Sequence, residues 1–162
     1  MPNTLTREAI LEEACRIGAA QFGGTLATMH AEDGTPYVTF VLFHLRPTGE
    51  LLFGSGPRPQ HVRNLHATPE VSFLIDNREV IRDDWATFNR LVIEGRADQI
   101  EESDPRYAEY LKELAAKNRM AAYFTEHGQM YVITPRRLIL MKGFEPERHI
   151  IEFDQFEKTP RK

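Results

Sequence analysis

Segments rich in strand-forming residues follow one another closely along this chain, and most are separated by short turns. Thr25–Ala31 and Pro36–Leu45 flank Asp33-Gly34, a dipeptide typical of hairpin turns. Further strands are predicted at Leu51–Phe53, Val71–Asp76, Leu91–Ala97, Gln129–Thr134, Arg137–Met141 and His149–Phe153. No regular β-α-β alternation appears, which argues against a doubly wound sheet. The pattern favours a mainly β fold, a closed or partly closed antiparallel barrel with helices at its ends.

Two segments carry helical patterns, one before the strands and one late in the chain. Thr6 to Gln21 has apolar residues at helical spacing, and Thr6 can cap its start. Ser103 can cap a second helix that begins near Pro105. At 162 residues we expect one domain spanning 1–162, with an N-terminal helix within 1–22 and a helical insertion at 103–126. The segment 37–43 is apolar on both faces, which predicts a central strand.

Composition and missing motifs exclude several classes of function. The formal net charge of -4 argues against general nucleic-acid binding, and no run of residues is apolar enough to span a membrane. The single Cys15 and the absence of an apolar signal core at the N-terminus lead us to expect a cytoplasmic protein. The chain contains no Gly-Lys-Ser/Thr phosphate loop, no Cys-x-x-Cys and no His-Glu-x-x-His, so we expect no metal site.

A short basic stretch, GSGPRPQHVRNLHATPEV, occupies residues 54–71 of this acidic chain. Pro59 can start a helix over about residues 60–66, whose first amide groups lack helical partners and attract anions. The glycines allow close backbone approach, and donors come from Ser55, Arg58, Gln60, His61 and Arg63. The stretch therefore predicts a phosphate-binding site, and the alternative is a solvated basic helix end.

The order of these motifs resembles that of the flavin-binding split-barrel family related to pyridoxamine 5′-phosphate oxidase. The matching residues are Leu26-Ala27-Thr28, Asp33-Gly34-Thr35-Pro36, Arg63-Asn64-Leu65, Pro69 and Val71, over roughly residues 20–150. The resemblance implies a six-stranded antiparallel split β-barrel with flanking helices, usually a homodimer. It also implies FMN in a groove between the subunits, with its phosphate held by basic residues before the short helix.

The same resemblance assigns residues to the flavin site. Besides the basic stretch with Asn64, it implies that Thr39 and Val41 contact the flavin edge. Trp85 could stack on the ring, or could anchor a loop; Arg90 could reach a flavin carbonyl, or could lie at the surface.

The chain departs from the oxidase itself where that enzyme has fixed charge. Gln60 and His61 stand where the oxidase has an Arg-Lys pair, Thr39 stands in place of an arginine, and His44 lies near a lysine position. The resemblance therefore implies FMN binding more directly than the oxidase's own reaction. A heme-utilisation branch of the family has a histidine matching His61 and a C-terminal histidine as heme ligand, for which His149 is the candidate.

We therefore expect an FMN-dependent oxidoreductase that acts as a homodimer on a small molecule the sequence does not identify. The alternatives are a heme-binding or heme-degrading protein of the same fold, a reductase that uses the deazaflavin F420, and a flavin-binding module without catalytic activity. No single residue is required as a catalytic acid or base.

Overall fold

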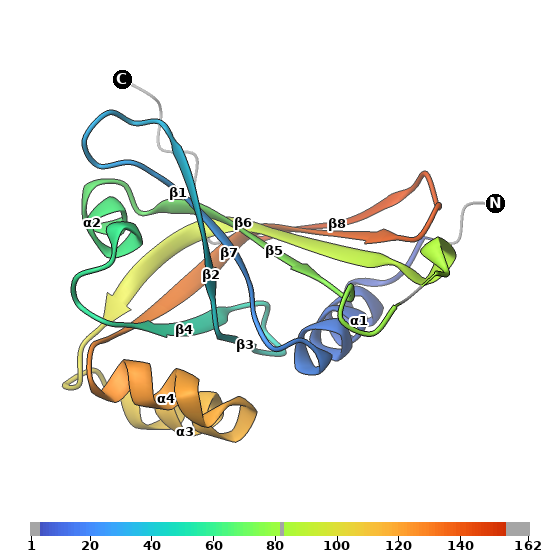
Figure 1. Ribbon diagram of the computed structural model, residues 1–162. Coiled ribbons are helices and arrows are strands. Elements are labelled where there is room, and N and C mark those ends of the chain that lie inside the picture. The colour runs from blue at the N-terminus through green and yellow to red at the C-terminus, as the bar shows by residue number, and fades with distance from the viewer. Residues whose placement is uncertain (1–3, 82, 155–162) are drawn as a thin grey trace.

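The computed structural model describes residues 4–81 and 83–154, and in them one antiparallel sheet is flanked by helices (Figure 1). The strands are β1 (Gly24–Met29), β2 (Pro36–Val41), β3 (Phe43–Leu45), β4 (Leu51–Ser55), β5 (Glu70–Asp76), β6 (Asn89–Ile100), β7 (Gln129–Lys142) and β8 (Arg148–Glu152). The helices are α1 (Arg7–Ala20), α2 (Gln60–Ala67), the 3-10 turn η1 (Trp85–Thr87), α3 (Tyr107–Lys117) and α4 (Arg119–Glu126). No helix within the described residues is both long and apolar enough to span a membrane.

The strand order is β2-β1-β5-β6-β7-β4-β3, and β8 pairs with β7 beside this path. The sheet curls into a split barrel, as the sequence predicts, although the described residues form eight strands where the family resemblance implies six. Leu42 interrupts the predicted strand 36–45 and separates β2 from β3. The last strand, β8, corresponds to the strand predicted at His149–Phe153.

The predicted central position of segment 37–43 is wrong, because β2 lies at one end of the strand order. Its outward-facing Val38 and Phe40 are 62% and 57% exposed. The inward-facing Val41 joins the main core with Leu26 and Phe73. One apolar face of the strand therefore meets the core, and the other is exposed at the surface of the chain.

The sequence predicted two late strands on either side of Pro135. The structure instead has one strand, β7, which runs through Pro135. The register between β6 and β7 shifts there, since Glu94 pairs with Arg137 and Gly95 with Pro135. Proline has no amide hydrogen to donate, and a bulge is a position where a strand can do without that bond. A Cβ on Gly95 would lie 2.2 Å from the carbonyl oxygen of Thr134, so this close approach requires glycine.

Two short helices form the late helical segment in place of a single one. Ser103 does not cap α3, which begins after Arg106. Asn118 ends α3 and starts α4, because its side chain accepts a hydrogen bond from the amide of Met120 at 2.8 Å. Arg46 anchors α3 beside β3 through an ion pair with Glu113 at 2.9 Å.

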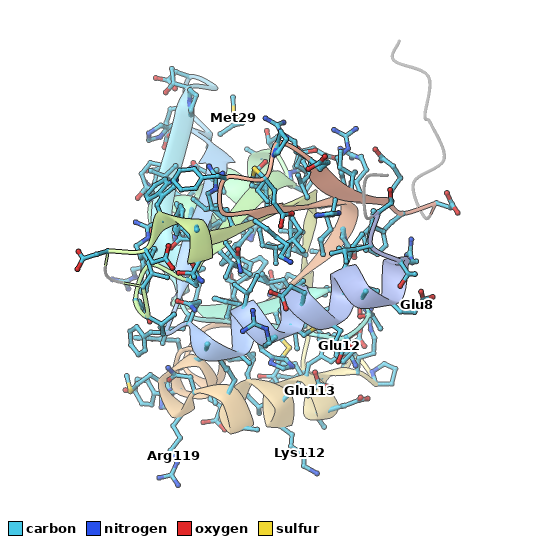
Figure 2. The ribbon with its side chains drawn as sticks, turned by 90° about the vertical axis from the view of Figure 1, so that its right-hand side faces the viewer. Glu8, Glu12, Met29, Lys112, Glu113 and Arg119 are labelled. Carbon is cyan, nitrogen blue, oxygen red and sulfur yellow. The ribbon has the colours of Figure 1, made fainter. Side chains whose placement is uncertain are left out.

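The helices lie against different parts of the sheet. At the start of α1, Thr6 caps the helix as predicted, accepting a hydrogen bond from the amide of Ala9. In Figure 2, α1 crosses the front of the molecule and the α3–α4 pair lies below it. Lys117 joins these two layers, since its ammonium donates to the carbonyl oxygens of Gly18 at 3.1 Å and Gln21 at 2.8 Å. Beside this layer, α4 packs directly on β4 through Gly54.

Candidate functional site

A cavity of about 420 Å³ opens where β2 ends, β4 ends and α2 begins, with α4 as a further wall. The volume lies within the range of roughly 300–1,000 Å³ that is typical of small-molecule sites. Its lining residues are Phe22, Phe40, Val41, Leu42, Gly54, Ser55, Gly56, Pro59, His61, Met120 and Phe124. Three of the residues predicted for the site, Val41, Ser55 and His61, therefore face one cavity.

Ser55 and His61 form the polar pair of this cavity. The Ser55 Oγ lies 2.8 Å from Nε2 of His61 and 3.1 Å from the carbonyl oxygen of Gly56. Both side chains are buried, and burial lowers the pKa of His61 below its ordinary range. At neutral pH the ring is therefore uncharged, and the pair offers a hydroxyl and an imidazole rather than a fixed charge.

Two glycines at the end of β4 have different roles. A Cβ on Gly54 would lie 2.0 Å from Oγ1 of Thr125 and 2.8 Å from its amide nitrogen, so Gly54 lets α4 pack directly on β4. A Cβ on Gly56 would meet no atom within 4 Å. The backbone at Gly56 is thus open to a bound molecule, whereas Gly54 is a packing position.

Asn64 and Gln60 lie on the side of α2 that faces the β1–β2 turn. Asn64 is fully buried; its Oδ1 accepts from the amide of Ala31 at 2.9 Å, and its Nδ2 donates to Oγ1 of Thr28 at 2.9 Å. Gln60 donates to Oδ1 of Asn64 at 2.8 Å and to Glu32 at 2.9 Å. These two predicted site residues therefore hold α2 against the β1–β2 turn, which lies beside it in Figure 1, and neither residue lines the cavity.

The two arginines of the basic stretch differ in how they are engaged. Arg63 donates to the carbonyl oxygen of Arg58 at 3.0 Å and to Oε1 of Gln60, and it lies 3.7 Å from Glu32. Glu32 thus neutralises part of the positive charge of the predicted phosphate-binding site. Among the described residues, the guanidinium of Arg58 has no hydrogen-bond or ion-pair partner. Arg58 is exposed and precedes Pro59 at the rim of the cavity.

Thr39 is half-buried on β2, pairs with Leu26 across the β1–β2 ladder and does not line the cavity.

The turn η1, which contains Trp85, and the start of β6, which contains Arg90, lie at the other end of the sheet, at the right of Figure 1, whereas α2 and α4 lie at the left. Trp85 is 52% exposed, and its ring centroid lies 4.6 Å from that of Phe88 and 6.5 Å from that of Phe144. The Arg90 guanidinium lies 5.6 Å from the centre of the Phe88 ring. Within a single chain, Trp85 and Arg90 therefore do not reach the cavity.

His149 also lies at this second end, on the core-facing side of β8 opposite Leu140. It is only 8% exposed, and its Nε2 makes no hydrogen bond within the described residues. The carboxylate of Glu145 lies 3.6 Å away. His149 is thus separated from His61 by the length of the sheet.

Sequence reasoning missed the α4 wall of the cavity. Phe124 lines the cavity together with Met120, and Tyr123 is exposed. The available signal was the spacing of Met120, Tyr123 and Phe124, which gives α4 an apolar stripe beside its buried alanine face.

The curled antiparallel sheet, with a short helix after β4, defines this chain as a split β-barrel protein. It belongs to the pyridoxamine 5′-phosphate oxidase family, whose sequence profile matches residues 11–145. Among curated proteins no match was found.

Several solved structures share the fold. A heme-binding protein from Mycobacterium smegmatis is 24% identical with a TM-score of 0.76; the alignment covers 91% of this chain and 60% of that one. A FAD-binding protein from Mesorhizobium loti is 17% identical with a TM-score of 0.65, covering 85% and 95%. The heme storage protein HutZ from Vibrio cholerae is 18% identical with a TM-score of 0.61, covering 81% and 92%. At these identities the likeness describes the fold alone.

Proposed function

We propose that this protein is an FMN-binding flavoprotein and an oxidoreductase that acts on a small molecule. The observation that carries the proposal is the 420 Å³ cavity, because the end of β2, the end of β4 and the start of α2 form it. These are the segments that the family resemblance assigns to FMN. Bound FMN would supply hydride or single-electron transfer, and the protein would supply position and electrostatics.

The residues around the cavity fit a flavin. The apolar side chains of Val41 and Leu42 suit the faces of a ring, and the open backbone at Gly56 allows close approach. The phosphate would lie at the start of α2, where the first amide groups of the helix point outward and Arg58 has no other described partner. In this arrangement Arg58, rather than Gln60 or Arg63, provides the fixed positive charge.

A second copy of the chain would complete the site. The exposed Val38 and Phe40 form an apolar strip on the edge strand β2, and Trp85 and Arg90 lie far from the cavity of their own chain. In a homodimer that buries this strip, the end of the sheet that carries Trp85 and Arg90 in one chain would cover the cavity of the other chain. This arrangement agrees with the expectation that the cofactor lies between subunits.

The test is titration of the purified protein with FMN, followed by quenching of flavin fluorescence, with F420 titrated in parallel. We expect saturable binding of FMN. A hydrogen bond to a charged group contributes about 1.5–3 kcal/mol, so Arg58→Gln should weaken binding by roughly 10- to 100-fold. Arg96→Gln is the matched control, because Arg96 is exposed on β6 and pairs with Asp98. Absence of FMN binding at any concentration tested would contradict the proposal.

Heme binding is the second candidate, and the buried His149 favours it. Its Nε2 makes no hydrogen bond within the described residues, so this nitrogen could coordinate a heme iron. Addition of hemin should then produce a Soret band that disappears in His149→Ala. A band that survives this change would eliminate His149 as the ligand.

A further inference from the structure

Large apolar side chains surround the mouth of the cavity on two opposite sides. Met120 and Phe124 project from α4, and Phe22 and Phe40 approach from the β1–β2 side, where their rings stack with centroids 6.1 Å apart. All four are among the exposed large hydrophobic residues, and Met120 is 49% exposed. Exposed apolar side chains that converge on one concave site mark a place where an apolar molecule binds.

No side chain with a fixed charge lines this cavity among the described residues. Its polar side chains, Ser55 and His61, bond to each other. The cations at the start of α4 are directed elsewhere. Lys117 donates to backbone carbonyl oxygens of the α1 layer, and Arg119 points away from the body of the protein (Figure 2).

The α4 wall is fixed rather than a mobile lid. Gly54 lets both turns of α4 pack directly on β4, because a Cβ there would lie 2.9 Å from the carbonyl oxygen of Ala121 and 2.0 Å from Oγ1 of Thr125. Just after the last residue of α4, a Cβ on Gly128 would lie 2.0 Å from the carbonyl oxygen of Ser55. Because both ends pack this closely on β4, the shape of the cavity is preformed.

From these contacts we infer that the molecule acted on at this site is neutral, planar and largely apolar, and that Met120 and Phe124 select it against phosphorylated or otherwise anionic compounds. The inference rests on the proposed function, in which the FMN phosphate lies outside the cavity beside Arg58. The α4 side of the cavity then remains for the second molecule. An anion there would lose its hydration and gain no fixed positive charge from the side chains that line the cavity.

The test compares 1-naphthol with 1-naphthyl phosphate, which share a ring and differ by an anionic group. Binding of each to the full-length protein is measured by calorimetry, with and without saturating FMN. We expect 1-naphthol to bind at least about tenfold more tightly, because burying an uncompensated anion is costly. Equal or tighter binding of 1-naphthyl phosphate would overturn the inference.

Variants on α4 test which residues select the ligand. Met120→Ala and Phe124→Ala should each weaken 1-naphthol binding by roughly tenfold, since each removes apolar contact area. Tyr123→Ala is the matched control: Tyr123 is an exposed aromatic residue of the same helix that does not line the cavity. Unchanged 1-naphthol affinity in both cavity variants would overturn the assignment of α4.

A gain of charge provides the opposite test. Met120→Lys places an ammonium at a half-exposed position, and it should strengthen 1-naphthyl phosphate binding several-fold while weakening 1-naphthol. Failure to change the preference would count against α4 as the selecting wall. The two proposals can fail separately: 1-naphthol binding without FMN uptake rejects the flavin, whereas FMN uptake without discrimination between the naphthyl compounds rejects the inferred substrate class.

Discussion

His61 illustrates how a single residue changes meaning between sequence and structure. The sequence places it in a basic stretch, where it could contribute charge to a phosphate site. The structure buries it against Ser55, and burial lowers the pKa of its ring. A buried neutral imidazole holds a hydroxyl in place, and it contributes no fixed charge at neutral pH. The fixed charge near the cavity therefore comes from Arg58.

The lowered pKa of His61 predicts how stability depends on pH. Below the ordinary value of 6.5, the unfolded chain binds a proton at this histidine more readily than the folded chain does. The free energy of unfolding should then be highest above that pH and fall as the solution becomes more acidic. Urea unfolding followed by circular dichroism between pH 5 and 8 measures this slope.

His61→Gln should make the same profile less steep below pH 6.5, because the variant has no ring to protonate at this position. His66→Gln is the matched control, since His66 is an exposed histidine of the same helix. A profile for His61→Gln as steep as that of the unchanged chain would show that other groups cause the acid loss of stability.

The sequence singled out a segment that contributes to the cavity, but it did not predict where each side chain of that segment points. Successive residues of a helix differ in direction by about 100°, so Gln60 and His61 cannot both face the cavity. Gln60 turns toward Glu32 of the β1–β2 turn, and His61 turns toward Ser55. Only the packing of α2 on its neighbours decides between these directions, and residue spacing does not carry that information.

At the scale of elements, substitutions at two neighbouring glycines test how closely α4 packs on β4. Gly54→Ala places a Cβ 2.0 Å from Oγ1 of Thr125, so α4 must shift. We expect a loss of about 1–3 kcal/mol in the free energy of unfolding, the usual cost of overpacking. Gly56→Ala meets no atom within 4 Å and should stay within roughly 0.5 kcal/mol. Equal unfolding midpoints for the two variants in urea would contradict this account of the contact.

Local signals predicted the elements that local chemistry determines. Asp33-Gly34 forms the expected turn, with Gly34 at a φ of 72° and Asp33 accepting from the amide of Thr35. The predictions failed where a distant partner decides the outcome. Pro135 stays within β7 because Gly95 of β6 accommodates a bulge opposite it. The edge position of β2 likewise depends on the order of the whole sheet.

For the whole molecule, the exposed strip on β2 predicts assembly. Size-exclusion chromatography with light scattering should give twice the chain mass of 18.7 kDa. Val38→Asp should yield a folded monomer, because Val38 is 62% exposed in the single chain and its change disturbs no core contact. Ala115→Asp, at an exposed position of α3, is the control and should remain dimeric. A dimer that persists in Val38→Asp would assign the interface to another face.

The long β6–β7 ladder, which runs from Asn89 paired with Lys142 to Ile100 paired with Met130, has a consequence for how the molecule opens. One end of this ladder adjoins the cavity, and the other carries η1 and β8. Either end can fray while the ladder stays intact, because local opening requires only that the contacts of that end be lost. Solvent reaches the ladder's central amide groups only when the sheet comes apart as a unit. The amide groups at the two ends can therefore exchange with solvent independently, whereas those at the centre of the ladder exchange slowly.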